Sequence, residues 1–169
     1  MSIAEMLLPE WDIEMATTRK ILERVPDDEE RAHWKPHPKS FPMGHLAQLV
    51  SRMPGWAAMI LKQTELDIAP VDRTVPGYSF EKTESLLAEF DRGVVEGRAA
   101  IAATSDDDFQ VTWTMKVAGQ AVSSGTRYIQ FRTSMLNHLV HHRAQLGVYL
   151  RMEDLPVPSM YGPTADERW

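Results

Sequence analysis

Apolar residues recur at alternating spacings of three and four in four separate stretches of this chain. This period is typical of helices that bury one face, and it is the strongest constraint on the fold. In the first stretch, the shared face carries Leu8, Trp11, Met15, Thr18, Leu22 and Val25. The first helix is expected to end before Pro26, since proline disfavours helix in the residue that precedes it.

The second predicted helix begins after an N-cap at Ser40, with Pro42 in its first turn. Its inward face carries His45, Leu49, Met53, Trp56 and Ile60. Pro54 and Gly55 fall inside it, so we expect a kink or a short break at that point. A polar loop through Pro76–Gly77 follows this helix.

The third helical face carries Leu87, Phe90, Val94, Gly97 and Ile101, and the helix is expected to end before Thr104. The fourth and longest helix is predicted from about Thr126 to Met152. Its inward face carries Phe131, Met135, His138, His142, Leu146 and Tyr149.

Between the third and fourth helices the apolar period changes to two. Apolar residues alternate with polar ones from Phe109 to Val117, which predicts a half-buried strand, and Ala118–Gly119 can turn the chain back into a second strand. The sequence therefore predicts an all-α protein: a four-helix bundle with a small β-hairpin between helices three and four. Residues 1–169 are expected to form a single domain with an irregular, proline-rich tail from about residue 153.

Charge and composition exclude several classes of function. The net charge of −6 argues against an electrostatic grip on nucleic acid or on an anionic membrane. No apolar run reaches the roughly 18–20 residues of a membrane-spanning helix, and the N-terminus lacks the basic region of a secretory signal. The absence of cysteine removes disulfides, thiolate ligands and a cysteine nucleophile, and it is compatible with a reducing cytoplasm. We therefore expect a soluble, cytoplasmic protein.

The six histidines are the best candidates for chemistry. His138 and His142 are four residues apart, so a helix places both imidazoles on one face, where they can chelate one cation. Two partly buried or surface histidines are the commoner meaning of this spacing. Here, however, both lie on an otherwise apolar face, where an imidazole needs a hydrogen-bond partner or a ligand. His45 lies on the inward face of another helix, so the three imidazoles can converge and leave a coordination position open.

These residues resemble the DinB/YfiT family of metal-dependent bundle proteins. The resemblance is carried by Gly44–Leu49, by Asn137–Gly147 with its HxxxHRxQ pattern, and by the tail Pro156–Pro163. It covers essentially the whole chain. It implies an up-down-down-up four-helix bundle, often a homodimer, in which three histidines hold a divalent metal, commonly nickel or zinc. The corresponding ligands here are His45, His138 and His142.

The resemblance also bears on the reaction. Characterised members are mostly thiol-dependent enzymes, which implies a thiol transferase acting on a small electrophile, with a low-molecular-weight thiol as partner. A cation held by imidazoles can lower the pKa of a bound thiol, and without cysteine in the chain that thiol has to be a substrate. The same site could ionise water for a metal-dependent hydrolase, or the metal could be structural in a non-catalytic bundle. The sequence leaves the substrate and the native metal open.

Other residues are weaker candidates. Asn137, Arg143 and Gln145 flank the histidine pair and could hold the ligands by hydrogen bonds or bind an anionic substrate, although ordinary helix contacts are the simpler interpretation. His33 and His37 fall in a loop that could line a pocket mouth, but exposed loop histidines are the simpler expectation, and His141 is expected to face solvent or a neighbouring subunit. Trp11, Trp56 and Trp113 are expected to fill the core, one of them as a pocket wall. The acidic run 106–108 lacks the spacing of a calcium loop and is expected to be a solvated loop.

Overall fold

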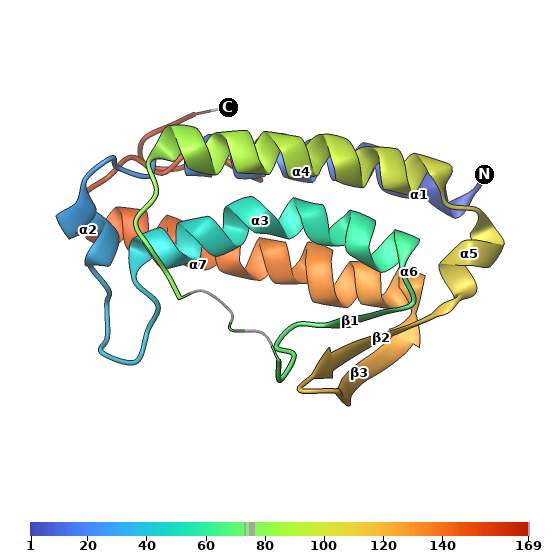
Figure 1. Ribbon diagram of the computed structural model, residues 1–169. Helices are drawn as coiled ribbons and strands as arrows, with labels where there is room; N and C mark the ends of the chain where they lie inside the picture. The colour runs from blue at the N-terminus through green and yellow to red at the C-terminus, as the bar shows by residue number, and fades with distance from the viewer. Residues whose placement is uncertain (73, 75–76, 169) are drawn as a thin grey trace.

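A computed structural model describes residues 1–72, 74 and 77–168 as a mainly helical protein with a small three-stranded sheet (Figure 1). The long helices are α1 (Ile3–Leu22), α3 (Met43–Lys62), α4 (Thr83–Ala103) and α7 (Asn137–Met152). They lie side by side, with α3 packed against both α4 and α7 and α1 against α4 (Figure 1). No helix in the described ranges is both long enough and apolar enough to cross a membrane.

The helices begin and bury their faces largely as the sequence predicts. Ser2 caps α1 through a capping box, in which its hydroxyl accepts from the Glu5 backbone N–H and the Glu5 carboxylate accepts from the Ser2 N–H. Trp11 and Met15 of α1, Met53 of α3 and Phe90 of α4 all lie in one buried core. The apolar period therefore identifies the faces that meet in the core.

Two details of α3 differ from the prediction. The helix begins at Met43 with Pro42 as its N-cap residue, so Ser40 lies outside it. The Met43 N–H donates to the Trp34 carbonyl, which gives this end of the helix a backbone partner in place of a side-chain cap. The helix also continues through Pro54 without a break, and Pro54 is buried where α3 packs against α4.

The sheet is larger than the predicted hairpin. Strands β2 (Thr112–Val117) and β3 (Gln120–Thr126) form the expected antiparallel pair, and Ala118 and Gly119 both have the positive φ that a tight hairpin turn requires. A third strand, β1 (Glu65–Asp67), follows α3 directly and pairs in parallel with β2. A carboxylate oxygen of Asp67 accepts from the Gly119 N–H at 2.6 Å, which fastens β1 to the hairpin turn.

Short helices replace two segments expected to be irregular or extended. Helix α2 (Glu29–His33) lies in the connection before α3, and helix α5 (Asp106–Gln110) covers the acidic run and Phe109. The Ser105 hydroxyl accepts from the Asp108 N–H, and aspartates in the first turn of a helix favour its positive end. The predicted strand start at Phe109 is therefore wrong by three residues.

The fourth long segment is continuous but not uniformly α-helical. It begins at Arg127 with Thr126 as its N-cap and runs through α6 (Arg127–Gln130), a π-helical segment η1 (Phe131–Leu136) and then α7. π-helical turns are rare and often lie at functional sites. Here the turn directly precedes the histidine-bearing helix.

Candidate metal centre

His138 and His142 lie next to each other on α7, as their spacing predicts. The ring centroids are 4.5 Å apart, and the two Nε2 atoms are 2.8 Å apart. His142 is buried and His138 is half-buried. The pair therefore forms a compact nitrogen cluster that is largely screened from solvent.

The other ring nitrogens lie beside oxygens that can accept a hydrogen bond. His138 Nδ1 lies 3.3 Å from the Ser134 carbonyl oxygen, and His142 Nδ1 lies 2.8 Å from Gln145 Oε1. Both oxygens favour the tautomer with its hydrogen on Nδ1. In a neutral imidazole of that tautomer, Nε2 carries the lone pair that a metal ligand requires.

The 2.8 Å contact between the two Nε2 atoms is either a hydrogen bond, in which one Nε2 carries the hydrogen, or a pair of lone pairs that share a cation. A proton is one such cation, but burial lowers the pKa of His142; the hydrogen bond with Gln145 opposes this shift, and the imidazoles of His138 and His141 add to it. A divalent metal is the other candidate. With metal–nitrogen bonds of about 2.1 Å, two neighbouring ligands of one ion lie about 3.0 Å apart in octahedral and about 3.4 Å apart in tetrahedral geometry. The pair therefore fits two ligands of one ion after a small opening.

His45, the third predicted ligand, has other neighbours in this structure. Its ring stacks on Tyr78, with ring centroids 5.3 Å apart and ring planes 7° apart, and its ring centroid lies 4.6 Å from that of Phe41. Burial, and secondarily the charge of Arg52, lowers the pKa of His45, which favours the neutral form that a metal ligand requires. In the described part of the chain, no three His, Cys, Asp or Glu side chains are close enough together to hold a metal. The three-histidine set therefore stays a prediction, with His138 and His142 already adjacent.

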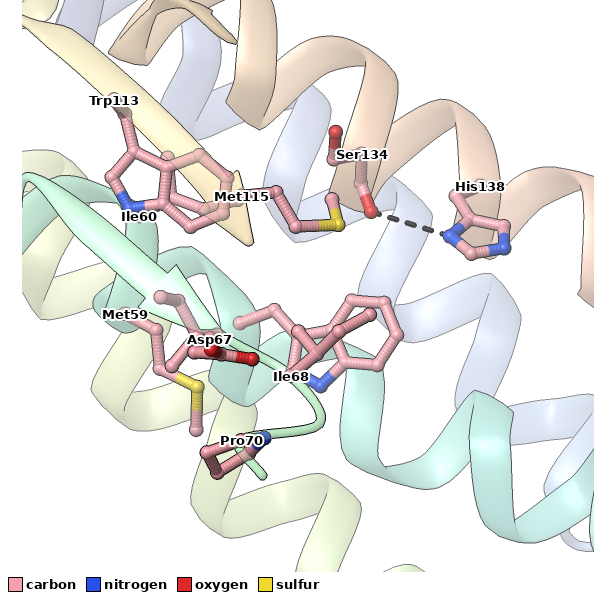
Figure 2. Close-up of a pocket in the computed structure, with 11 residues that line it drawn as sticks. Met59, Ile60, Asp67, Ile68, Pro70, Trp113, Met115, Ser134 and His138 are labelled. Carbon is pink, nitrogen blue, oxygen red and sulfur yellow. Dashed lines mark hydrogen bonds between the residues drawn. The ribbon is translucent and has the colours of Figure 1, made fainter. Parts of the chain in front are cut away.

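A cavity of about 480 Å³ adjoins the histidine pair on its His138 side. Figure 2 shows His138 at one end of this cavity and Trp113 at the other, with Met59, Ile68 and Met115 among the residues between them. The cavity lies between α3, the segment that begins with β1, strand β2 and the η1–α7 segment. A small molecule bound there would contact His138 directly.

Of the residues that flank the pair, Gln145 has the contact a supporting residue needs. Its side-chain oxygen lies in hydrogen-bond contact with His142 Nδ1. Asn137, in contrast, is exposed. Arg143 points the other way and is only 1% exposed. It pairs with the Glu14 carboxylate at 2.7 Å and also donates to the Thr18 hydroxyl and to Tyr161.

The contacts of Arg143, Glu14 and Tyr161 hold the C-terminal tail against α1. Tyr161 donates to the Glu14 carboxylate at 2.8 Å, and the Arg143 guanidinium lies over the Tyr161 ring. Sequence reasoning missed Glu14 and Tyr161 as partners of this arginine. An arginine on the apolar face of a helix was the available signal, since it requires a buried anion.

The remaining candidates have ordinary environments. His33, His37 and His141 are exposed, as expected. Trp11 and Trp113 are buried, and both Trp56 and Trp113 are cavity walls.

Comparison with solved structures places this arrangement among known folds. A DinB-like protein from Bacillus cereus matches with a TM-score of 0.67 and 21% sequence identity, and the match covers 95% of this chain and 98% of that protein. A DinB-like protein of Bacillus subtilis, YjoA, matches with a TM-score of 0.65 and 13% identity, over 92% of this chain and 97% of that protein. No family model and no curated protein sequence matches the chain. At these identities the likeness establishes the fold: the chain has the DinB-like fold that the sequence resemblance implied.

Proposed function

We propose that this protein is a metal-dependent enzyme that acts on a small molecule, with a divalent nickel or zinc ion held by His45, His138 and His142. The observation that carries the proposal is the pair of Nε2 atoms that face each other 2.8 Å apart. Ser134 and Gln145 lie beside the two Nδ1 atoms as acceptors, which favours a lone pair on each Nε2. His45 lies on α3, which packs against α7, and would be the third ligand.

We favour thiol transfer as the reaction. A divalent ion at this site supplies a Lewis acid, which lowers the pKa of a thiol beside it. The thiol loses its proton to solvent, its sulfur forms a bond to the electrophilic atom of the second substrate, and the leaving group departs with the electrons of the broken bond. The chain contains no cysteine, so the thiol is a substrate, and the cavity beside His138 provides space for the electrophile.

The arrangement of the long helices supports the same family of proteins. In Figure 1, α1 and α7 run in one direction and α3 and α4 in the opposite one. This order of directions supports the up-down-down-up four-helix bundle that the sequence resemblance implies. Assembly as a homodimer in the cytoplasm belongs to the same proposal.

Metal content tests the site. The purified protein, reconstituted with zinc or nickel and dialysed, should hold about one ion per chain by elemental analysis, and His138→Ala or His142→Ala should lose most of it. His141→Ala is the matched control, because His141 lies on the same helix but is exposed, and it should keep the ion. His45→Ala decides the third ligand: unchanged metal affinity in that variant would remove His45 from the set. Wild-type protein without metal after reconstitution would overturn the proposal.

A spectroscopic measurement distinguishes the reactions. Adding 2-mercaptoethanol to the cobalt-substituted protein should produce a sulfur-to-cobalt charge-transfer band, and the band should be absent in His142→Ala. A protein that binds cobalt but shows no spectral change when the thiol is added would favour the hydrolase. A site closed by a fourth side chain would favour a structural metal in a non-catalytic bundle.

A further inference from the structure

The cavity beside His138 has walls that are almost entirely apolar. Its lining residues are Trp56, Met59 and Ile60 of α3, Leu66 to Ile68 and Pro70, Trp113 and Met115 of β2, and Ser134 and His138. The volume of about 480 Å³ lies within the range of small-molecule sites. Indole rings and flexible thioethers are surfaces that suit a flat or irregular apolar ligand.

The polar groups in these walls are already engaged. Both carboxylate oxygens of Asp67 accept backbone N–H groups, Oδ1 from Ala69 at 3.1 Å and Oδ2 from Gly119 at 2.6 Å. The Ser134 hydroxyl donates to Gln130 Oε1 at 2.8 Å. Among the described residues that line the cavity there is no lysine or arginine. An anionic ligand group would therefore lose its water without gaining a cationic partner, which is costly, whereas a cationic group would meet the Asp67 carboxylate.

His138 marks the end of the cavity where a reaction could take place. It is the lining residue whose Nε2 belongs to the facing pair. A ligand that fills the apolar part is held with one end against this imidazole. The cavity thus supplies binding surface along its length and chemistry at one end.

We infer that this cavity binds the electrophilic substrate and that this substrate is a neutral, mainly apolar small molecule, discriminated from anionic molecules of the same size. The assignment of the ligand as a substrate rests on the proposed function. The binding itself requires no metal, so it can be measured independently.

The test uses three phenyl compounds of matched size that differ in charge: 2-phenylethanol, phenylacetate and 2-phenylethylammonium. They are titrated into the full-length, metal-free protein at about pH 8, above the ordinary imidazole pKa of about 6.5. The reporter is the indole N–H resonance of Trp113, assigned by its loss in Trp113→Phe. This indole is 2% exposed and, within the described residues, has no acceptor, so its resonance is sensitive to a ligand in the cavity. We expect saturable binding of 2-phenylethanol and binding of phenylacetate that is at least about tenfold weaker, and 2-phenylethylammonium should bind better than phenylacetate because the Asp67 carboxylate attracts it.

A charge placed in the wall should reverse this preference. Met115→Lys puts an ammonium group in the cavity, and it should weaken 2-phenylethanol and strengthen phenylacetate by about tenfold each. Val117→Lys is the matched control: it adds the same charge to the same strand, two residues further on and outside the cavity lining, and should leave all three affinities unchanged. Circular dichroism and the melting temperature establish that each variant folds.

The outcomes separate this inference from the metal proposal. Phenylacetate that binds wild-type protein as well as 2-phenylethanol does would overturn the inference, as would the absence of any saturable shift at Trp113. Neither result bears on metal content. Conversely, a protein that binds 2-phenylethanol selectively but holds no metal would keep the neutral-ligand site and lose the proposed enzyme.

Discussion

Two glycines in the long helices should respond to alanine with opposite signs. A Cβ added at Gly97 of α4 would lie 2.5 Å from Cη2 and 2.6 Å from Cζ2 of Trp11, and 3.0 Å from the Pro54 carbonyl oxygen. A Cβ added at Gly55 of α3 would have no described atom within 4 Å outside its own helix. The pair therefore separates helix propensity from packing within one protein.

The magnitudes follow from these distances. Alanine is favoured over glycine in a helix by about 1 kcal/mol, so Gly55→Ala should stabilise the protein by about 0.5–1 kcal/mol. At Gly97 the Trp11 ring has to move by about 1 Å to reach an ordinary carbon–carbon contact. Trp11 is fully buried and lies against Phe131, with ring centroids 6.1 Å apart, so this movement disturbs the core. Overpacking typically costs about 1–3 kcal/mol, and two contacts below 3 Å with a fully buried indole place this site at about 2–3 kcal/mol. Subtracting the propensity gain of about 1 kcal/mol leaves Gly97→Ala destabilised by about 1–2 kcal/mol.

Urea denaturation followed by circular dichroism measures both variants against the wild type. The two free energies of unfolding should differ by about 1.5–3 kcal/mol, and melting temperatures should shift by about 2–4 °C per kcal/mol in a domain of this size. A Gly97→Ala protein as stable as the wild type would refute the close packing of α4 on Trp11. A Gly55→Ala protein less stable than the wild type would show that the space beside Gly55 is filled by other atoms.

Three further predictions concern the site and the tail. Gln145→Leu removes the acceptor of the His142 Nδ1–H and should weaken zinc affinity by about 10–100-fold in a chelator competition, whereas Gln145→Glu keeps an acceptor and should retain it. Burial lowers the pKa of His45 and His142 in the folded state, so the unfolded chain binds more protons than the folded one as the pH falls through about 6.5. The metal-free protein should therefore lose stability below about pH 6.5, measured as a lower urea midpoint. A urea midpoint that is the same from pH 8 to pH 5.5 would contradict this. Tyr161→Phe removes the hydroxyl that donates to Glu14, so limited proteolysis should cut the C-terminal tail faster while the helices stay folded. Tyr128→Phe is the control. Equal cleavage rates in Tyr161→Phe and the wild type would argue that Tyr161 does not hold the tail in place.

The parts of the fold that the sequence predicts correctly are those with a repeated local signal. The spacing of Trp11, Met15 and Leu22 identifies a buried helical face whatever its partner is. Ala118–Gly119 identifies the hairpin because few residue pairs accept positive φ at both positions. The spacing of His138 and His142 likewise predicts their contact, since both lie on one helix.

The features that were missed depend on contacts between distant segments. Strand β1 is three residues long with one apolar side chain, Leu66, so it has no period to detect, and it exists because β2 offers an edge. Phe109 begins an alternating pattern that predicts a strand, but the Ser105 cap starts a short helix that includes Phe109. The position of His45 relative to the other two histidines depends on how α3 and α7 are aligned, which no local pattern specifies.

The π-helical segment before α7 makes the site tolerant of a change in chain length at one place and intolerant of it at another. A π-helical turn accommodates one residue more than an α-helical turn, so the extra residue is taken up within the turn and the helix that follows keeps its orientation. Deleting one exposed residue of this segment, such as Thr133, would let it relax to an α-helix with α7 in nearly the same orientation and with His138 still beside Trp56. Deleting one residue between His138 and His142, in the regular helix α7, would instead turn His142 by about 100° relative to His138 and separate the two imidazoles. The same loss of one codon is therefore absorbed in Phe131–Leu136 and destroys the site one turn further on.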